Sequence, residues 1–190
     1  CIKLDRDTYM FVLGPSKELL NTYKDEDNEL SLCLLLKYFN MDVLFTGDVE
    51  ERGEKNLIEN LKTDIDFLKV PHHGSNTSSS EEFLRSINPK VAFISVGRNN
   101  IYGHPHEDVL DRYEALGIDI YRTDESGLIN LVLDKEYFYI ETFVKAKTNL
   151  YNILEKYSIP ILIGILYLYI QYLMVKSFLK TAKELERIEL

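Results

Sequence analysis

The side chains best suited to chemistry in this sequence gather in three short segments. Thr46-Gly47-Asp48 follows one apolar run, Pro71-His72-His73-Gly74 follows another, and Asn99 to His106 follows the run Val91–Val96. All four histidines lie in the second and third segments. Carboxylates and imidazoles are ordinary ligands of zinc-like metals, and groups fixed at strand ends suit a catalytic site. The pattern therefore indicates metal-assisted chemistry.

The paired histidines and His104 are expected to have different tasks. Adjacent side chains on an extended segment point apart, so one of His72 and His73 should hold a metal while the other supports it or contacts substrate. His104 precedes Pro105 and a helix beginning near His106. The N-terminus of that helix would suit a phosphate oxygen and would keep a nearby imidazole neutral.

Several candidates also have a structural interpretation that the sequence leaves open. Asp48 could cap a helix beginning at Glu50, because Asp is a favoured N-cap residue. Asn99 and Asn100 suit turn-forming bonds as well as a contact to substrate. We interpret His106 as a solvated helix residue. Three acidic residues are taken as helix-end or strand-edge charges rather than ligands: Glu50, Asp64 and Asp66.

The elements that must position these groups alternate between strands and helices up to about residue 143, which predicts an α/β fold. Several strands are continuous apolar runs, as expected when both faces of a sheet are covered. The predicted strands are Thr8–Leu13, Leu30–Phe39, Asp42–Thr46, Asp66–Val70, Val91–Val96, Asp119–Arg122, Leu128–Leu133 and Tyr137–Phe143. The predicted helices are Glu50–Leu61, Ser80–Ile87 with a capping box from Ser79 to Glu82, and Glu107–Leu116 ended by Gly117. Asn21–Glu29 and Thr123–Gly127 are predicted loops.

Composition and charge narrow the class of protein. Hydrophobic content of 45% and charged content of 28% are typical of a globular chain. A net charge of −9 argues against a generally basic nucleic-acid-binding surface, although metals can supply positive charge locally. Cys33 is expected to be a small core residue. The sequence starts at Cys1, and no signal peptide is predicted within it. We interpret it as cut from something longer, with a mature lipoprotein as the weaker alternative.

The composition changes near residue 145. Residues 144–158 are predicted to form a connecting helix, 159–176 a transmembrane helix and 177–190 a charged tail. A buried core or oligomer helix is the alternative for 159–176. Four basic residues follow the uncharged run Ile159–Val175 and three precede it, which slightly favours the C-terminus inside and the remaining domain outside the cytoplasm.

Four ordered motifs carry a resemblance to a known family. They are TGD, LKVPHHGS, SVGxNxxYGHP (Ser95 to Pro105) and YRTDxxG (beginning at Tyr121). Together they resemble the metallo-β-lactamase-like domain of ComEC-type competence proteins and related stand-alone hydrolases, over about residues 10 to 133. The resemblance implies an αββα sandwich with its metal site at one edge of two facing sheets.

The resemblance also implies roles for particular residues. Asp48 matches the metal-bridging aspartate, His73 is favoured as the metal ligand with His72 beside the substrate phosphate, and His104 is implied in phosphate binding or proton transfer. The motif residues implied in substrate binding are Ser75, Asn99, Tyr102 and His104. The implied cofactors are two divalent metals, Zn or Mn. The implied reaction is hydrolysis of a phosphodiester, with DNA as substrate and a link to DNA uptake; a small phosphoester is the alternative substrate.

One part of the family pattern is missing. The main metal-binding signature, His-x-His-x-Asp-His, is absent from this chain, so the site is predicted to be incomplete and the chain inactive by itself. The partners implied are the missing N-terminal half of the domain, which would cover an apolar sheet face, and membrane lipid around 159–176. The expected location is a bacterial cell membrane. The competing hypothesis is a membrane-tethered, non-enzymatic remnant or interaction module.

Overall fold

The computed structural model describes residues 1–22, 27–61 and 63–144. These residues belong to one compact unit, Cys1–Val144. The predicted connecting helix from residue 145 onward, the predicted transmembrane helix 159–176 and the predicted tail 177–190 lie outside the described residues. Within the three described ranges, no helix has the length and apolar character needed to cross a membrane.

A seven-stranded mixed sheet forms the centre of the unit, with the strands in sequence order from β1 to β7. The first four strands pair antiparallel, and β4 to β7 pair in parallel. Parallel strands end at the same edge of a sheet, so the segments that follow β4 to β7 meet there. The strands are β1 (Ile2–Lys3), β2 (Thr8–Gly14), β3 (Cys33–Tyr38), β4 (Met41–Phe45), β5 (Phe67–Lys69), β6 (Val91–Ile94) and β7 (Asp119–Arg122).

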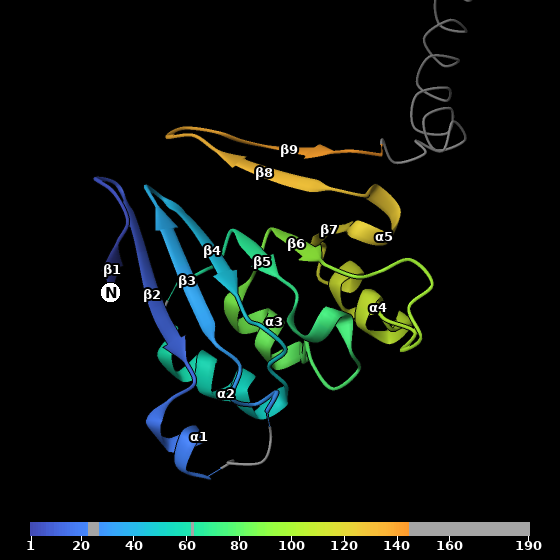
Figure 1. Cartoon of the computed structure of the whole chain (residues 1–190), viewed down its shortest axis with the longest axis horizontal. Helices are drawn as coiled ribbons and strands as arrows, with labels where there is room; N and C mark the ends of the chain where they lie inside the picture. Colours follow the sequence, from blue (N-terminus) through green and yellow to red (C-terminus); the bar gives the residue numbers. More distant parts are fainter. Residues whose placement is uncertain (23–26, 62, 145–190) are drawn as a thin grey trace, which may run out of the picture. The chain divides into compact units, whose positions relative to one another are not determined.

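The helices that follow the parallel strands cover one face of this sheet, and Figure 1 shows α2, α3 and α4 together on that side. Their apolar residues pack on the strands in one core, in which Leu44, Leu68 and Phe83 have no exposed surface. The helices are α1 (Lys17–Thr22), α2 (Glu51–Asn60), α3 (Glu81–Ile87), α4 (Glu107–Ala115) and α5 (Thr123–Ser126), with a 3-10 turn at Pro71–Gly74.

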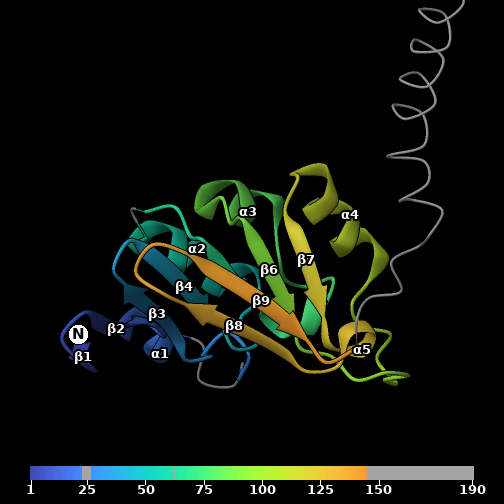
Figure 2. The ribbon, with the colours of Figure 1, turned by 90° about the horizontal axis from the view of Figure 1, so that it is seen from above.

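A two-stranded sheet, β8 (Ile129–Leu133) and β9 (Phe138–Thr142), lies on the opposite face (Figure 2). It packs against a second, smaller apolar cluster, in which the rings of Phe67 and Phe138 meet edge to face at 4.8 Å. Val12 and Phe45 on this face remain 55% and 39% exposed. The α/β class is therefore confirmed, and part of the apolar face is open as predicted. The described residues form no outer helical layer on the hairpin, so the αββα sandwich is only partly present.

Some local predictions need correction. The N-cap of α3 is Ser80, whose hydroxyl accepts from Phe83 N, and not Ser79, because three consecutive serines make the register ambiguous. Thr123–Ser126 is a short helix rather than a loop, and α1 was not predicted. Gly117 does follow α4 with φ +70°, and the N–H groups of Gly117 and Ile118 bond back to Glu114 and Tyr113 as in a Schellman motif.

Cys33 is a buried core residue, as predicted: it is 1% exposed, and burial raises the pKa of its thiol to about 12. Cys1 is exposed. We therefore expect a thiol reagent at pH 8 to modify Cys1 alone in the folded chain and both cysteines in denaturant. Mass spectrometry of the labelled chain would measure this, and rapid native labelling of Cys33 would contradict the packing described here.

Candidate functional site

The residues predicted to bind metal or act in catalysis meet at the carboxyl edge of the parallel strands. Asp48 follows β4, the histidine pair follows β5, His104 lies in the long segment after β6, and Thr123 follows β7. Hydrogen bonds join these segments: His72 N donates to Gly47 O at 3.2 Å, and His106 N donates to Gly74 O at 2.9 Å. Ligands of parallel α/β sheets bind at this edge, so the topology assembles a site from residues far apart in sequence.

Asp48 and His73 form the closest pair of candidate metal donors. Asp48 Oδ1 lies 3.6 Å from His73 Nε2, and the two side chains are 42% and 43% exposed. His73 Nδ1 lies 2.5 Å from Ser95 O. A carbonyl can only accept, so Nδ1 must carry the hydrogen and Nε2 presents its lone pair toward Asp48. A backbone carbonyl that fixes the tautomer in this way is typical support for a metal-binding histidine.

The donor pair fits a metal ion but does not complete a site. Zinc–nitrogen and zinc–oxygen bonds of about 2.0–2.2 Å at tetrahedral to trigonal angles place two donors roughly 3.3–3.7 Å apart, which includes the observed separation. Across the described ranges, no group of three or more His, Cys, Asp or Glu side chains converges on one point. The described residues therefore supply two donors to a site that needs more.

The histidine pair lies on a tight turn rather than on the extended segment that the sequence suggested. Both residues have left-handed backbone conformations, with φ of 45° for His72 and 55° for His73. Such conformations cost about 1–3 kcal/mol at residues other than glycine, and they cluster at functional sites. Their side chains do diverge as expected. His73 turns to Asp48, and His72 Nδ1 lies 3.2 Å from Glu50 Oε1.

His104 adds a third imidazole beside the pair. Its ring lies 5.7 Å from that of His72 and stacks on the ring of Tyr102 at 5.8 Å with 17° between planes. Burial, followed by the charges of the three other histidines, lowers the pKa of His104. Its buried Nδ1 has no hydrogen-bond partner among the residues that the structure describes. A buried acceptor without a partner is the kind of group that a ligand can satisfy.

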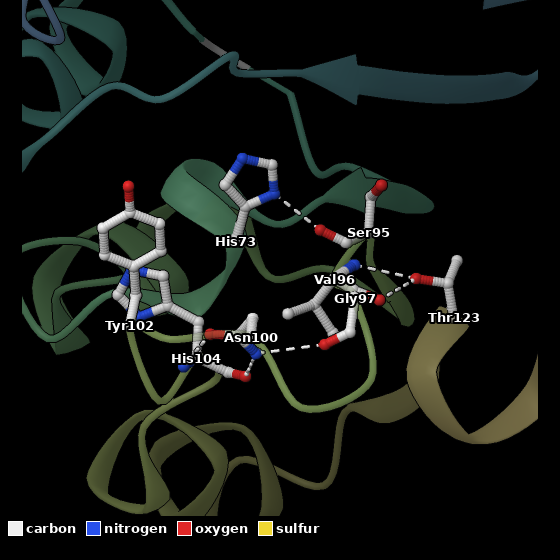
Figure 3. Close-up of a pocket in the computed structure, with 8 residues that line it drawn as sticks. All are labelled: His73, Ser95, Val96, Gly97, Asn100, Tyr102, His104 and Thr123. Carbon is white, nitrogen blue, oxygen red and sulfur yellow. Dashed lines mark hydrogen bonds between the residues drawn. The ribbon is translucent and has the colours of Figure 1, made fainter.

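A cavity of about 450 Å³ opens between His73 and His104. Figure 3 shows its lining, which comes from the histidine turn, the segment after β6 and the start of α5. The lining residues are His73, Ser95, Val96, Gly97, Asn100, Tyr102, His104 and Thr123. A mostly neutral, histidine-lined hollow beside a pair of metal donors can hold a small anionic group such as a phosphate.

Polar side chains fix the long segment that carries His104. Asn100 Oδ1 accepts from His104 N at 2.9 Å, and its Nδ2 donates to His104 O at 2.6 Å, so Asn100 is a turn-forming residue that positions His104. The hydroxyl of Thr123 bridges the backbone N and O of Val96, both at 2.7 Å. Arg122 binds both oxygens of Asp124. The YRTD motif thus holds the wall of the cavity.

Two of the predicted substrate-binding residues do not reach the cavity lining. Ser75 is 4% exposed and its hydroxyl pairs with that of Thr77 at 2.9 Å. Asn99 is exposed on the outer loop with φ of 59°. Neither Ser75 nor Asn99 is among the residues that line the hollow.

The capping alternative for Asp48 is wrong, because the N-cap of α2 is Glu50. The first turn of α2 is capped instead by the buried carboxylate of Glu29, which accepts from the N–H groups of Arg52 and Gly53. Asp48 therefore does not cap this helix. Glu50, which we interpreted as a helix-end charge, is a neighbour of His72. The link spans 22 positions and has no local sequence signal.

Comparison with known proteins agrees with the motif resemblance. Residues 26–98 match the metallo-beta-lactamase superfamily. The chain is 44% identical over 105 residues to ComE operon protein 3 of Bacillus subtilis, covering 54% of this chain and 13% of that protein. It is 40% identical over 114 residues to competence protein ComA of Neisseria gonorrhoeae, covering 58% and 16%, and 37% identical over 111 residues to recombination protein 2 of Haemophilus influenzae, covering 58% and 14%.

These matches concern only a part of each relative, since the chain spans about one seventh of their length. Among solved structures, a proposed metal-dependent hydrolase from Parabacteroides distasonis has 19% identity and a TM-score of 0.38 over 54% of this chain and 46% of that one. That similarity is too low to support an argument about either fold or function.

Proposed function

Because residues 26–98 match the metallo-beta-lactamase superfamily, we propose that this chain forms part of a metal-dependent hydrolase domain that cleaves phosphodiesters. In this proposal Asp48 and His73 hold a metal ion, while His72 and His104 contact the substrate phosphate. A bound divalent cation such as Zn²⁺ or Mn²⁺ would supply Lewis-acid polarisation of a phosphoryl oxygen. The protein groups would hold the cation, orient the phosphate and offer imidazoles for proton transfer.

The observation that carries the proposal is the pairing of Asp48 Oδ1 with His73 Nε2 at 3.6 Å, with the opposite ring nitrogen bound to a backbone carbonyl. This arrangement prepares a lone pair and a carboxylate oxygen for one cation. The Nδ1 of His104, which has no hydrogen-bond partner within the described ranges, lies at the same edge of the sheet and supports a bound ligand there. Both features suit a metal-assisted reaction at a phosphorus centre.

The relatives support a more specific setting. One is named a ComE operon protein, one a competence protein and one a recombination protein. We therefore propose that the substrate is DNA and that the chain acts in DNA uptake within a longer protein. We propose a bacterial membrane as the location and the outside of the cytoplasm as the side on which the domain works. Residues 159–176 are the proposed membrane anchor.

Metal titration of the full 190-residue chain tests the site directly. After dialysis against a chelator, we expect calorimetry with Zn²⁺ to show one weak site, because only two donors converge among the described residues. Asp48→Ala and His73→Ala should each weaken this binding at least about tenfold. Asp64→Ala and His106→Ala are the matched controls and should leave the affinity unchanged.

Two outcomes of this titration would contradict the proposal. Unchanged affinity in His73→Ala would remove the metal site from Asp48 and His73. Tight binding of two metals per chain would instead show that the described donors are not the whole site.

A non-enzymatic module is the second candidate, favoured by the absence of a third converging donor within the described ranges. It predicts that Asp48→Ala and His73→Ala leave every activity of the full-length protein unchanged. A nuclease assay on purified full-length protein separates the two candidates, since loss of DNA cleavage in both variants excludes the module without chemistry.

A further inference from the structure

Glu50 is the only carboxylate that the described structure places against His72. Its Oε1 lies 3.2 Å from His72 Nδ1, and both side chains are about three-quarters buried. The same oxygen accepts from Asn28 Nδ2 at 3.1 Å and from Thr77 Oγ1 at 3.0 Å. Glu50 is therefore held by two neighbours from different loops, and its position does not depend on His72.

The groups around His72 Nδ1 are both hydrogen-bond acceptors. The carboxylate of Glu50 can only accept. Thr77 Oγ1 lies 3.5 Å from Nδ1 and already donates its hydrogen to Glu50, so it faces Nδ1 with a lone pair. A neutral imidazole has one N–H and one bare nitrogen, and the N–H is stable only where an acceptor meets it.

We propose that Glu50 is a positioning residue that fixes His72 in the Nδ1–H tautomer and leaves Nε2 as the basic atom of the ring. Glu50 then acts through His72, as the third group of a catalytic triad acts through its imidazole. The backbone hydrogen bond from His72 N to Gly47 O anchors the other end of the same residue. With His73 fixed by Ser95 O, both imidazoles of the pair would present Nε2.

The role of that nitrogen in catalysis rests on the proposed function, but the tautomer does not. It can be measured without metal or substrate, by long-range ¹H–¹⁵N correlation on the ¹⁵N-labelled full chain at pH 8. The His72 signals are assigned by their loss in His72→Gln. We expect the Nδ1–H form of His72 to dominate at least about tenfold, the bias that a hydrogen bond to a charged group provides.

Two variants distinguish positioning from a merely structural effect. Glu50→Ala should shift His72 toward the Nε2–H form, whereas Thr77→Val, which removes the other neighbour and keeps the carboxylate, should retain the Nδ1–H form. His73 is an internal control, because the Ser95 carbonyl should keep its tautomer unchanged in both variants.

A wild-type His72 in the Nε2–H form would overturn the inference, and so would an Nδ1–H form that survives in Glu50→Ala. If Glu50→Ala does not fold, the tautomer of His72 in the wild type still tests the inference. If the tautomer measurement contradicts the inference, the role of Glu50 is rejected and the result of the metal titration is unaffected. If the titration contradicts the proposed function, the tautomer result is unaffected.

Discussion

Replacing Glu54 with Ala is expected to lower the free energy of unfolding by about 3–5 kcal/mol. Glu54 has no exposed surface, and its two oxygens accept from Ser79 N at 2.5 Å and Ser80 N at 2.9 Å. Alanine would leave both N–H groups buried without an acceptor, each at a cost of about 1–3 kcal/mol. Urea unfolding followed by circular dichroism at pH 7 measures the loss.

Glu51→Ala is the matched control. Glu51 lies on the same helix, is exposed, and pairs with Lys55 one turn away. Its removal should change the free energy of unfolding by no more than about 0.5 kcal/mol. Equal losses in Glu51→Ala and Glu54→Ala would contradict the role given to the buried carboxylate.

The charge of Glu54 adds a pH dependence with a definite sign. Burial raises the pKa of Glu54, although hydrogen bonds from Ser80 and Ser79 and the charge of Arg112 oppose this. A carboxyl whose pKa is raised by folding binds more protons in the native state, so stability falls as pH rises from about 4.5 through the native pKa. The wild type should therefore gain stability relative to Glu54→Gln when pH is lowered from 7 to 5. A loss of stability relative to Glu54→Gln over the same change of pH would contradict the raised pKa of Glu54.

This carboxylate matters to the site because it holds the segment that follows the histidine pair. Arg112 donates to the carbonyls of Ser78 and Ser79, and the hydroxyl of Ser78 donates to Pro71 O at 3.1 Å. The chain between the 3-10 turn and α3 is thus bonded to α2, to α4 and to its own start. Loosening it in Glu54→Ala should also weaken the metal binding proposed for His73.

The sequence predicts the strands around the site well and the polar network poorly. Runs such as Val43–Phe45 and Val91–Ile94 are apolar on both faces, and the polar motifs begin just after those runs. Their meeting at one edge therefore follows from parallel pairing. Glu54 had a usable signal, because it falls on the same helical stripe as Leu57 and Leu61. A glutamate on an apolar stripe indicates a buried partner.

Other features of the site could not be predicted from the residues next to them in the sequence. The contact of Glu50 with His72 and the cap that Glu29 provides for α2 join residues more than 20 positions apart, and only the tertiary structure brings them together. The conformation of the histidine pair was also unpredictable, because left-handed backbone at two consecutive non-glycine residues is rare. The hairpin β8–β9 was predicted as two strands, but its place on the open face of the sheet depends on packing alone.

The second large effect is expected at Gly74, where the two histidine-bearing segments touch. Gly74 has φ of +82°, and a Cβ there would lie 2.6 Å from Pro105 Cβ and 3.1 Å from Pro105 Cα. Gly74→Ala should therefore cost about 2–4 kcal/mol, of which about 1–2 kcal/mol is left-handed strain and the rest overpacking. Urea unfolding again provides the measurement.

Substitutions at two other glycines separate the cost of left-handed strain from the cost of overpacking. Gly117 also has a positive φ, of +70°, but no atom lies within 4 Å of its added Cβ, so Gly117→Ala should show the strain alone, about 1–2 kcal/mol. Gly97 has neither a positive φ nor a near neighbour, and Gly97→Ala should stay within about 0.5 kcal/mol of the wild type. A Gly74→Ala variant no less stable than Gly117→Ala would contradict the close approach of Pro105.

Gly74→Ala also tests whether the site depends on this contact, because Pro105 joins His104 to His106. Displacing Pro105 would break the bond from His106 N to Gly74 O and move the ring of His104 away from that of His72. Phosphate binding, followed by ³¹P line broadening in conditions where both variants are fully folded, should be weaker in Gly74→Ala than in Gly117→Ala. Equal binding would mean that His104 reaches the phosphate without His72, and the cavity beside His73 would then be the whole of the anion site.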